Sequence, residues 1–263
     1  MNLGIVGFGN IGQLLFENLV NIGYDKGNNI YLSNKTKSKL KHVNDISPST
    51  CICENNVDLA KNCEVIIIAV KTPQLLGVIK EIKPYLNEEK ILIHACAGIG
   101  FDEIDKIYDG PVTCIIPSIA STVVEDTEKS GVTIIYPSEK VDKNQRNFIE
   151  DLFSKFSYVE TVDNQKDLKA LMVTTSCMPA FIAQVVEIFS KKISEYSDLP
   201  YKDLERLLDV TVYSTVNILN TKTLNNDEIM EKVATKKGIT EKGLKYLEDK
   251  LPSFSEELID RLI

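Results

Sequence analysis

A glycine-rich turn lies within the first twelve residues of the chain. The segment GIVGFGNIG follows an apolar run typical of a β-strand and opens a stretch with helical periodicity. Gly7, Gly9 and Gly12 have G-x-G-x-x-G spacing, which permits a tight turn, close approach of the backbone to a pyrophosphate, and close packing of helix on strand. The helix start, with Asn10 and Ile11, adds N–H donors and a positive dipole end. The sequence therefore predicts a dinucleotide-binding turn.

Apolar runs recur through the first 160 or so residues, separated by helical patterns. Such runs are typical of strands that are covered by helices on both faces, and repeated strand–helix units imply a parallel, doubly wound sheet. We therefore predict an α/β fold in which residues 1–162 form a Rossmann-type domain. The runs expected to form strands are NLGIVGF, NIYLSN, CEVIIIAV, KILIHACAG, VTCIIPS and GVTIIY.

After about Asp163 the sequence predicts helices only. The stretch LKALMVTTSCMPAFIAQVVEIFSKKISEY reads as one long helix that is interrupted near Pro179. About a hundred residues with this much apolar surface form a thin core, so residues 163–263 are predicted to be an all-helical dimerisation domain. The alternative is packing against the first domain of the same chain. The apolar stripes are Ile182, Val185, Val186, Phe189 and Ile193; Leu204, Leu207, Leu208, Val212, Val216 and Leu219; and Phe254, Leu258, Ile259 and Leu262.

Composition limits the classes of function. The net charge is −8 and the lysines are scattered, which argues against a nucleic-acid partner. The most apolar run, Val65 to Val70, is too short to span a bilayer, and the N-terminus lacks the pattern of a signal peptide. The six cysteines lack zinc spacing and are expected to be small buried hydrophobes, with no metal site. We expect a soluble cytoplasmic protein without a membrane partner.

The end of the second expected strand bears on the choice of nucleotide. An NAD site usually has an acid there that binds the ribose hydroxyls, but this chain reads YLSNKTKSK. Ser33, Asn34, Lys35 and Lys37 stand at that position and can hold a 2′-phosphate. The sequence therefore favours NADP(H) over NAD(H), with solvated surface charge as the alternative for the two lysines.

Several segments together resemble one known family. GFGNIG, NCEVIIIAVKTPQLLGVIKEI and ACAGI are similar to segments of pyrroline-5-carboxylate reductase, and the resemblance covers nearly the whole chain. It implies that Asn56 contacts the adenosine part of the cofactor. It also implies that Ala69, Val70, Lys71 and Ala97 line the nicotinamide side.

The segment VATKKGITEKG, from Val233 to Gly243, resembles the signature loop of the same family. The resemblance implies that Thr235, Gly238 and Thr240 hold the carboxylate of pyrroline-5-carboxylate. It further implies that the Thr240 hydroxyl donates a hydrogen bond near the imine nitrogen, as the catalytic group. A glycine- and threonine-rich helix start is also a physically sensible anion site.

Three motifs around this site depart from the family pattern. Lys236 and Lys237 replace Pro-Gly and Ile239 replaces a threonine; Ser176 and Met178 replace two glycines; Cys114 replaces an arginine and Ser118 an asparagine. IPSI, SCMPAF and EKVATKKGITEKG resemble the late-competence branch of the family more closely. The predicted function is NADPH-dependent reduction of 1-pyrroline-5-carboxylate to proline. The alternatives are a competence-type homologue with a regulatory or scaffold role, and an NADP-dependent reductase of another small imine.

Overall fold

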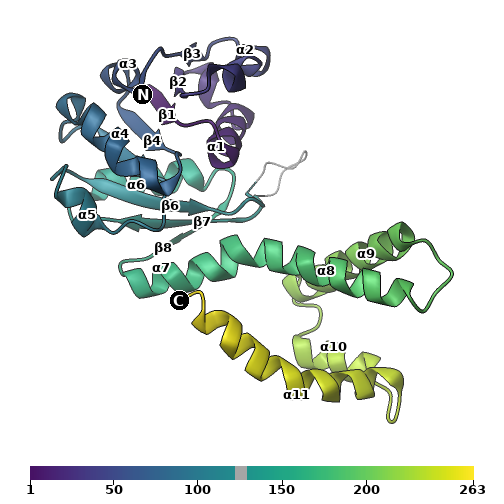
Figure 1. Cartoon of the computed structure of the whole chain (residues 1–263). Coiled ribbons are helices and arrows are strands. Elements are labelled where there is room, and N and C mark those ends of the chain that lie inside the picture. The colour runs from purple at the N-terminus through teal and green to yellow at the C-terminus, as the bar shows by residue number, and fades with distance from the viewer. Residues whose placement is uncertain (122–128) are drawn as a thin grey trace. The chain divides into compact units, whose positions relative to one another are not determined.

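The computed structural model describes residues 1–121 and 129–263 of the chain (Figure 1). The chain divides into two compact units, an N-terminal unit, Met1–Cys177, and a C-terminal unit, Met178–Ile263. The expected limits, 1–162 and 163–263, place the division earlier, where the last strand ends rather than where the contacts become sparse.

The N-terminal unit is built on one eight-stranded sheet with the strand order β3-β2-β1-β4-β5-β6-β7-β8. Neighbouring strands are parallel except β6 and β7, which are antiparallel. The predicted α/β fold with a mainly parallel sheet is confirmed. The edge strands β3 and β8 are absent from the expected runs, because β3 has two exposed residues and β8 alternates exposed and half-buried positions. The strands are β1 Leu3–Val6, β2 Ile30–Ser33, β3 Cys51–Ile52, β4 Val65–Ile68, β5 Ile91–His94, β6 Val112–Pro117, β7 Val132–Pro137 and β8 Tyr158–Thr161.

Helices cover both faces of this sheet, as the unbroken apolar strands predict (Figure 1). On β4, Val65 and Ile67 point to the face that packs against α1 and α6, whereas Ile66 and Ile68 point to the face that packs against α3 and α4. Every residue of β4 is therefore buried. The helices of this unit are α1 Asn10–Asn21, α2 Val43–Ile46, α3 Asn56–Asn62, α4 Leu75–Ile82, α5 Phe101–Asp105, α6 Lys143–Phe153 and α7 Gln165–Met172.

A π-helical turn, Val173–Cys177, follows α7 and leads into α8, Met178–Ser194. The interruption predicted near Pro179 lies here. Proline has no N–H to donate, and its ring crowds the carbonyl four residues earlier, so a wider turn relieves the clash. The hydroxyls of Thr174 and Thr175 donate to carbonyls one helical turn back, each at 2.9 Å.

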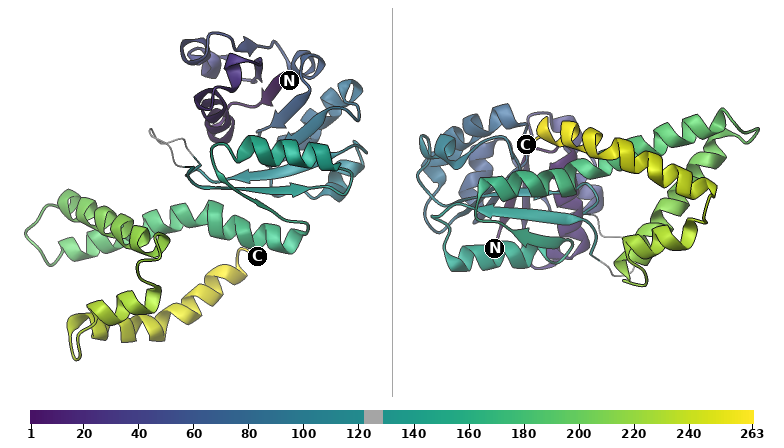
Figure 2. Two further views of the ribbon diagram at one scale, coloured as in Figure 1. Left: turned by 180° about the vertical axis from the view of Figure 1, so that it is seen from behind. Right: turned by 90° about the horizontal axis from the view of Figure 1, so that it is seen from below.

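The C-terminal unit contains helices only, as predicted. Helix α8 packs beside α9, and the views in Figure 2 agree on this pairing. Val186 and Ser190 are the only fully buried residues of this unit, all of which lies within the described part of the chain. Val185 and Phe189, on the predicted apolar stripe, are 53% and 52% exposed. One copy of this unit therefore leaves its apolar stripe uncovered. The remaining helices are α9 Tyr201–Asn220, α10 Asn226–Val233 and α11 Ile239–Asp260.

One helical stretch in the described residues, Gln165–Ser194, is long and apolar enough to cross a membrane by length and composition alone. Its mean hydropathy is 1.5 over the most apolar window, and 11% of that window is buried. The stretch is longer than Val65 to Val70, the run on which the expectation of no bilayer span rests. A helix that packs against a second copy of the chain has the same apolar character.

Candidate active site

The glycine turn between β1 and α1 has no space for a side chain at two of its glycines and has space at the third. Gly7 has a φ of +97°, and a Cβ on it would lie 2.6 Å from the carbonyl oxygen of Ala69. A Cβ on Gly12 would lie 2.1 Å from the carbonyl oxygen of Gly7. A Cβ on Gly9 would meet no described atom within 4 Å. Gly7 and Gly12 therefore serve the packing of the turn, whereas Gly9 leaves room for a ligand beside the backbone.

A cavity of about 510 Å³ opens at this turn, where the parallel strands β1 and β4 end. This is the edge at which open α/β sheets bind nucleotides. The first turn of α1 has no side-chain cap, so its N–H groups are available to an anion. The structure brings most of the predicted nucleotide residues together here: Gly7, Gly9, Asn10, Ile11, Asn34, Lys35, Ala69, Val70 and Lys71.

The lysines after β2 have different surroundings. The Lys37 ammonium donates to the backbone carbonyls of Cys53 at 2.6 Å and Glu54 at 2.8 Å, so it is already engaged in holding the chain after β3. Lys35 and Lys39 line the cavity together with Thr36. Sequence reasoning missed Lys39 and Thr36. The signal was the turn-forming run KTKSK, since a 3-10 turn brings residues three apart to one side, and here the Lys39 N–H donates to the Thr36 carbonyl at 3.2 Å.

Asn34 braces the loop that carries these lysines. Its side-chain oxygen accepts from the Phe8 N–H at 3.1 Å, and its amide nitrogen donates to the Thr36 carbonyl at 2.8 Å. Both ends of the amide are therefore bonded to backbone. This arrangement ties the loop after β2 to the glycine turn and fixes where the Lys35 backbone lies.

A smaller cavity of about 170 Å³, which shares Gly7, Asn34 and Lys35 with the larger one, is lined by Ser33 and Asn56. The Ser33 hydroxyl and the Asn56 side-chain oxygen are 2.8 Å apart. Asn56 begins α3 and Ser33 ends β2, so parallel strand–helix units bring them together across 23 residues. Ser33, predicted at a 2′-phosphate, and Asn56, predicted at the adenosine part, are thus neighbours.

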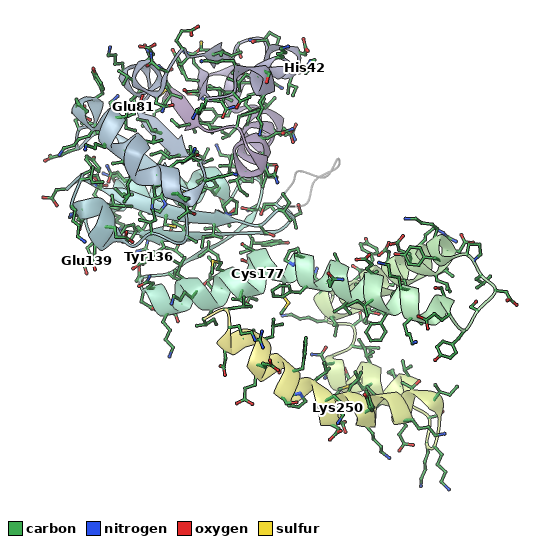
Figure 3. The ribbon with its side chains drawn as sticks, viewed as in Figure 1. His42, Glu81, Tyr136, Glu139, Cys177 and Lys250 are labelled. Carbon is green, nitrogen blue, oxygen red and sulfur yellow. The ribbon has the colours of Figure 1, made fainter. Side chains whose placement is uncertain are left out.

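Ala97, expected on the nicotinamide side, lines a different cavity, of about 570 Å³. Phe101 and Tyr136 line the same cavity, with ring centroids 4.8 Å apart (Figure 3 labels Tyr136). Cys114, which stands where the family has an arginine, is buried beneath them, and burial raises the pKa of its thiol to about 12. This thiol is therefore protonated at neutral pH, and it leaves room that a longer side chain would fill.

His94 ends β5 and is completely buried. Its Nδ1 accepts from the Cys96 N–H at 3.3 Å, while its Nε2 has no partner among the described residues. Burial lowers the pKa of His94 to about 4, so the ring is neutral at physiological pH. Of the six cysteines, Cys53, Cys63, Cys96 and Cys114 are buried as expected, whereas Cys51 is exposed and Cys177 half-buried.

The loop that resembles the family signature joins α10 to α11 in the C-terminal unit. The Gly238 N–H donates to the Thr235 carbonyl at 2.8 Å, and a Cβ on Gly238 would lie 2.3 Å from the Thr235 hydroxyl oxygen. Lys237, in a glycine position of the family, has a φ of +63°, a conformation that glycine adopts more easily. The loop thus keeps a glycine-like backbone although its side chains differ.

Helix α11 begins without a side-chain cap on Gly238. Thr240 is its second residue, in the uncapped first turn, and is half-buried. The Glu241 carboxylate accepts from the Lys237 N–H, which closes the turn. Lys236 instead lines a cavity with four carboxylates, those of Asp227, Glu231, Glu241 and Glu248. The carboxylates around Lys236 are unfavourable for an anionic substrate. The start of α11 offers uncapped N–H groups to an anion and also carries one of these carboxylates, Glu241, in its first turn.

Comparison with known proteins gives a consistent result. Residues 2–98 match the family described as NADP oxidoreductase coenzyme F420-dependent, and residues 165–262 match pyrroline-5-carboxylate reductase dimerisation. The chain is 23% identical to ComE operon protein 4 of Bacillus subtilis over 94% of this chain and 89% of that protein. The crystal structure of Plasmodium falciparum pyrroline carboxylate reductase with NADP bound has the same fold, with a TM-score of 0.81 at 20% identity, over 100% of this chain and 95% of that one.

A much higher identity is found with the pyrroline-5-carboxylate reductase of Methanobrevibacter smithii. The two sequences are 43% identical over 96% of this chain and 99% of that protein. At this coverage the match spans both units. The chain therefore belongs to the pyrroline-5-carboxylate reductase family, as its motifs predict.

Proposed function

We propose that this protein reduces 1-pyrroline-5-carboxylate to proline with NADPH. The observation that carries the proposal is the 43% identity to the Methanobrevibacter smithii reductase over almost the full length of both chains. The identity to ComE operon protein 4 is 23%, so the competence-type alternative has weaker support. The substitutions in the loop before α11 then belong to a working reductase.

The residues around the glycine turn fit a dinucleotide with a 2′-phosphate. Gly9 leaves space for a pyrophosphate, and the uncapped N–H groups of α1 face it. No acid lines the described cavity at the end of β2, whereas Lys35 and Lys39 do. The Plasmodium falciparum structure of this fold has NADP bound. These features support NADP(H) as the cofactor.

The reaction transfers a hydride from the reduced nicotinamide to the imine carbon, while the imine nitrogen takes up a proton. Ala69, Val70 and Lys71, which follow β4, are proposed to line the nicotinamide side; Ala97 lies in the other cavity and has no part in this proposal. Val70 and Ala69 are apolar and limit water at the reacting carbon. The protein contributes orientation and electrostatic stabilisation, not a carboxylate acid–base pair.

The substrate carboxylate is proposed to bind at the loop before α11. Thr235 would hold it through its hydroxyl and Thr240 through the N–H of the uncapped first turn, while Gly238, which has no side chain, lets the carboxylate approach the backbone. The Thr240 hydroxyl would donate a hydrogen bond to the imine nitrogen, which becomes more basic as hydride adds to the neighbouring carbon. Lys236, surrounded by carboxylates, has no direct part in this scheme.

The working protein is proposed to be a cytoplasmic homodimer formed through the C-terminal unit. Its support is the match of residues 165–262 to a dimerisation family and the exposed apolar stripe of α8. A second copy that covers this stripe also explains the apolar character of Gln165–Ser194 without a membrane. No nucleic-acid partner is proposed, given the net charge of −8.

The test is steady-state oxidation of NADPH by the purified protein with 1-pyrroline-5-carboxylate, and with its six-membered-ring analogue. The proposal expects saturable oxidation and a higher kcat/KM for the five-membered ring. A higher kcat/KM for the six-membered ring would favour the alternative that the protein is an NADP-dependent reductase of another small imine. No oxidation with either ring would favour the competence-type alternative.

A further inference from the structure

A short chain of hydrogen bonds runs from the smaller cavity to Glu81. The Ser33 hydroxyl is 2.8 Å from the Asn56 side-chain oxygen, and the Asn56 amide nitrogen is 2.8 Å from a Glu81 carboxylate oxygen. Glu81, labelled in Figure 3, lies in the last turn of α4 and does not line either cavity at the glycine turn. Among the described residues, its hydrogen-bond link to the nucleotide residues runs through Asn56.

The chemistry of these three groups fixes where the Ser33 proton points. An ionised carboxylate can only accept, so the Asn56 amide must turn its NH₂ group to Glu81. The amide oxygen then faces Ser33, and the Ser33 hydroxyl must donate to it. The hydroxyl proton is thereby committed to Asn56, and the oxygen lone pairs of Ser33 remain for the cavity.

This arrangement gives Ser33 the role that an acid has in an NAD site. An acid at the end of the second strand accepts from a ribose hydroxyl, and Ser33 can accept in the same way. It cannot at the same time donate to a phosphate oxygen. A 2′-phosphate must therefore be bound by other donors, and Lys35 and Lys39 are the cations that line the adjoining cavity.

We propose that Glu81 is a positioning residue that sets the hydrogen-bond polarity of the ribose subsite. Through Asn56 it makes Ser33 an acceptor for a ribose hydroxyl, and it thereby moderates the preference for NADPH over NADH that the lysines create. This proposal rests on the nucleotide part of the proposed function. It is tested by nucleotide binding, which does not require turnover of an imine.

The first experiment measures the Kd of NADPH and of NADH by fluorescence titration of the full chain. Glu81→Ala leaves the amide without a fixed orientation and is expected to weaken NADH by about three- to tenfold, the effect of one hydrogen bond, and NADPH by less, because its 2′-phosphate is held by the lysines. Glu81→Gln keeps an oxygen acceptor and should stay within about twofold of the unaltered protein. Glu89→Ala, which removes an exposed carboxylate outside this chain of bonds, is the matched control and should change neither Kd. Equal affinities for Glu81→Ala and Glu89→Ala would overturn the proposal.

The second experiment reverses the direction of the hydrogen bonds between residue 81, Asn56 and Ser33. In Glu81→Lys the ammonium can only donate, so the Asn56 amide must turn over and present its NH₂ group to Ser33. The Ser33 oxygen then accepts from Asn56, and the Ser33 hydroxyl can donate its hydrogen bond into the cavity, to a 2′-phosphate. The ratio of the NADH Kd to the NADPH Kd should therefore rise by about fivefold or more. In an Asn56→Ala background this rise should disappear. If Glu81→Lys raises the ratio equally in that background, the lysine charge acts directly and the proposal is wrong.

The two proposals fail in different ways. If the protein binds NADPH but forms no proline, the proposed function fails, while the ratio of Kd values still tests Glu81. If proline is formed but the Glu81 variants bind both nucleotides as the unaltered protein does, only the role of Glu81 fails. The two results come from separate measurements on the same variants.

Discussion

The Lys37 ammonium donates a hydrogen bond to the backbone carbonyl of Cys53 at 2.6 Å. It therefore holds the chain just after β3 and does not line the nucleotide cavity. The neighbouring carbonyl of Glu54 accepts from the same ammonium. Lys35, two residues earlier, lines that cavity. Two lysines that are indistinguishable in sequence thus have separate tasks.

Alanine at Lys35 should affect nucleotide binding, whereas alanine at Lys37 should affect the stability of the fold. Lys35→Ala should weaken NADPH by about tenfold and leave NADH nearly unchanged, because only the 2′-phosphate loses a charge-assisted hydrogen bond. Lys37→Ala should leave the ratio of the two Kd values unchanged and lower the melting temperature, because two carbonyls lose their donor. Fluorescence titration and thermal unfolding measure the two effects. A loss of NADPH preference in Lys37→Ala alone would contradict the assignment.

Alanine substitutions in the glycine turn should likewise affect NADPH binding at one position and stability at another. Gly9→Ala should leave the free energy of unfolding nearly unchanged, because its Cβ meets no described atom within 4 Å, but should weaken NADPH by at least about tenfold by occupying ligand space. Gly12→Ala should be destabilising by several kcal/mol, of the order seen for overpacking, because its Cβ would lie 2.1 Å from the Gly7 carbonyl oxygen. Urea unfolding and titration distinguish them. Equal NADPH affinity in Gly9→Ala would place the pyrophosphate elsewhere.

The loop before α11 should depend on Thr240 more than on Lys236. Thr240→Ala should lower kcat/KM for 1-pyrroline-5-carboxylate by about ten- to a hundredfold, the cost of one hydrogen bond to a group that develops charge. Thr240→Ser keeps the hydroxyl and should recover most of the activity. Lys236→Ala is the control and should change kcat/KM by less than about threefold, since its cavity is lined by carboxylates. An active enzyme that tolerates Thr240→Ala would exclude this loop as the substrate site.

The exposed stripe of α8 predicts assembly. The full chain should run as a dimer or larger at micromolar concentration in light scattering, because Val185 and Phe189 are about half exposed in one copy. Phe189→Glu should shift the mass toward a monomer, since a buried unpaired charge is costly. Lys192→Glu, a charge change at an exposed position of the same helix, should leave the mass unchanged. A monomeric mass for the unaltered chain would refute the assembly.

His94 predicts an acid-dependent loss of stability. Its pKa is lowered to about 4 in the folded protein, whereas an unfolded histidine titrates near 6.5. Between these values the unfolded chain binds a proton that the folded chain does not, so stability falls as pH decreases from about 6.5 to 4, by about 3 kcal/mol in total. His94→Asn keeps an acceptor for the Cys96 N–H and should flatten this part of the pH profile. Parallel profiles for both proteins would exclude His94 as the cause.

The local sequence was sufficient for the fold and the glycine turn. The spacing of Gly7, Gly9 and Gly12 and the unbroken apolar run of β4 depend on neighbours within one strand–turn–helix unit, and both appear as predicted. The same holds for the interruption before Pro179, which follows from the missing N–H of proline.

The different tasks of the lysines could not be predicted, because they depend on contacts between distant segments. Lys37 is fixed by carbonyls 16 and 17 residues away, and Asn56 by Glu81, which is 25 residues away. Sequence spacing alone gives Lys35 and Lys37 equal claim to a phosphate. Ala97 likewise lines the cavity of Phe101, whereas Ala95, two residues earlier, lines the cavity at the glycine turn.

The most direct test of the proposed reaction follows the hydride itself. The purified full chain is incubated with NADPH that carries deuterium at C4 of the nicotinamide, on each face in separate samples, and with 1-pyrroline-5-carboxylate. We expect that one of the two samples yields proline with one deuterium at its δ carbon, in equal amount to the NADP⁺ formed. NADPH oxidation without deuterated proline from either sample, or no oxidation at all, would contradict the proposed reaction.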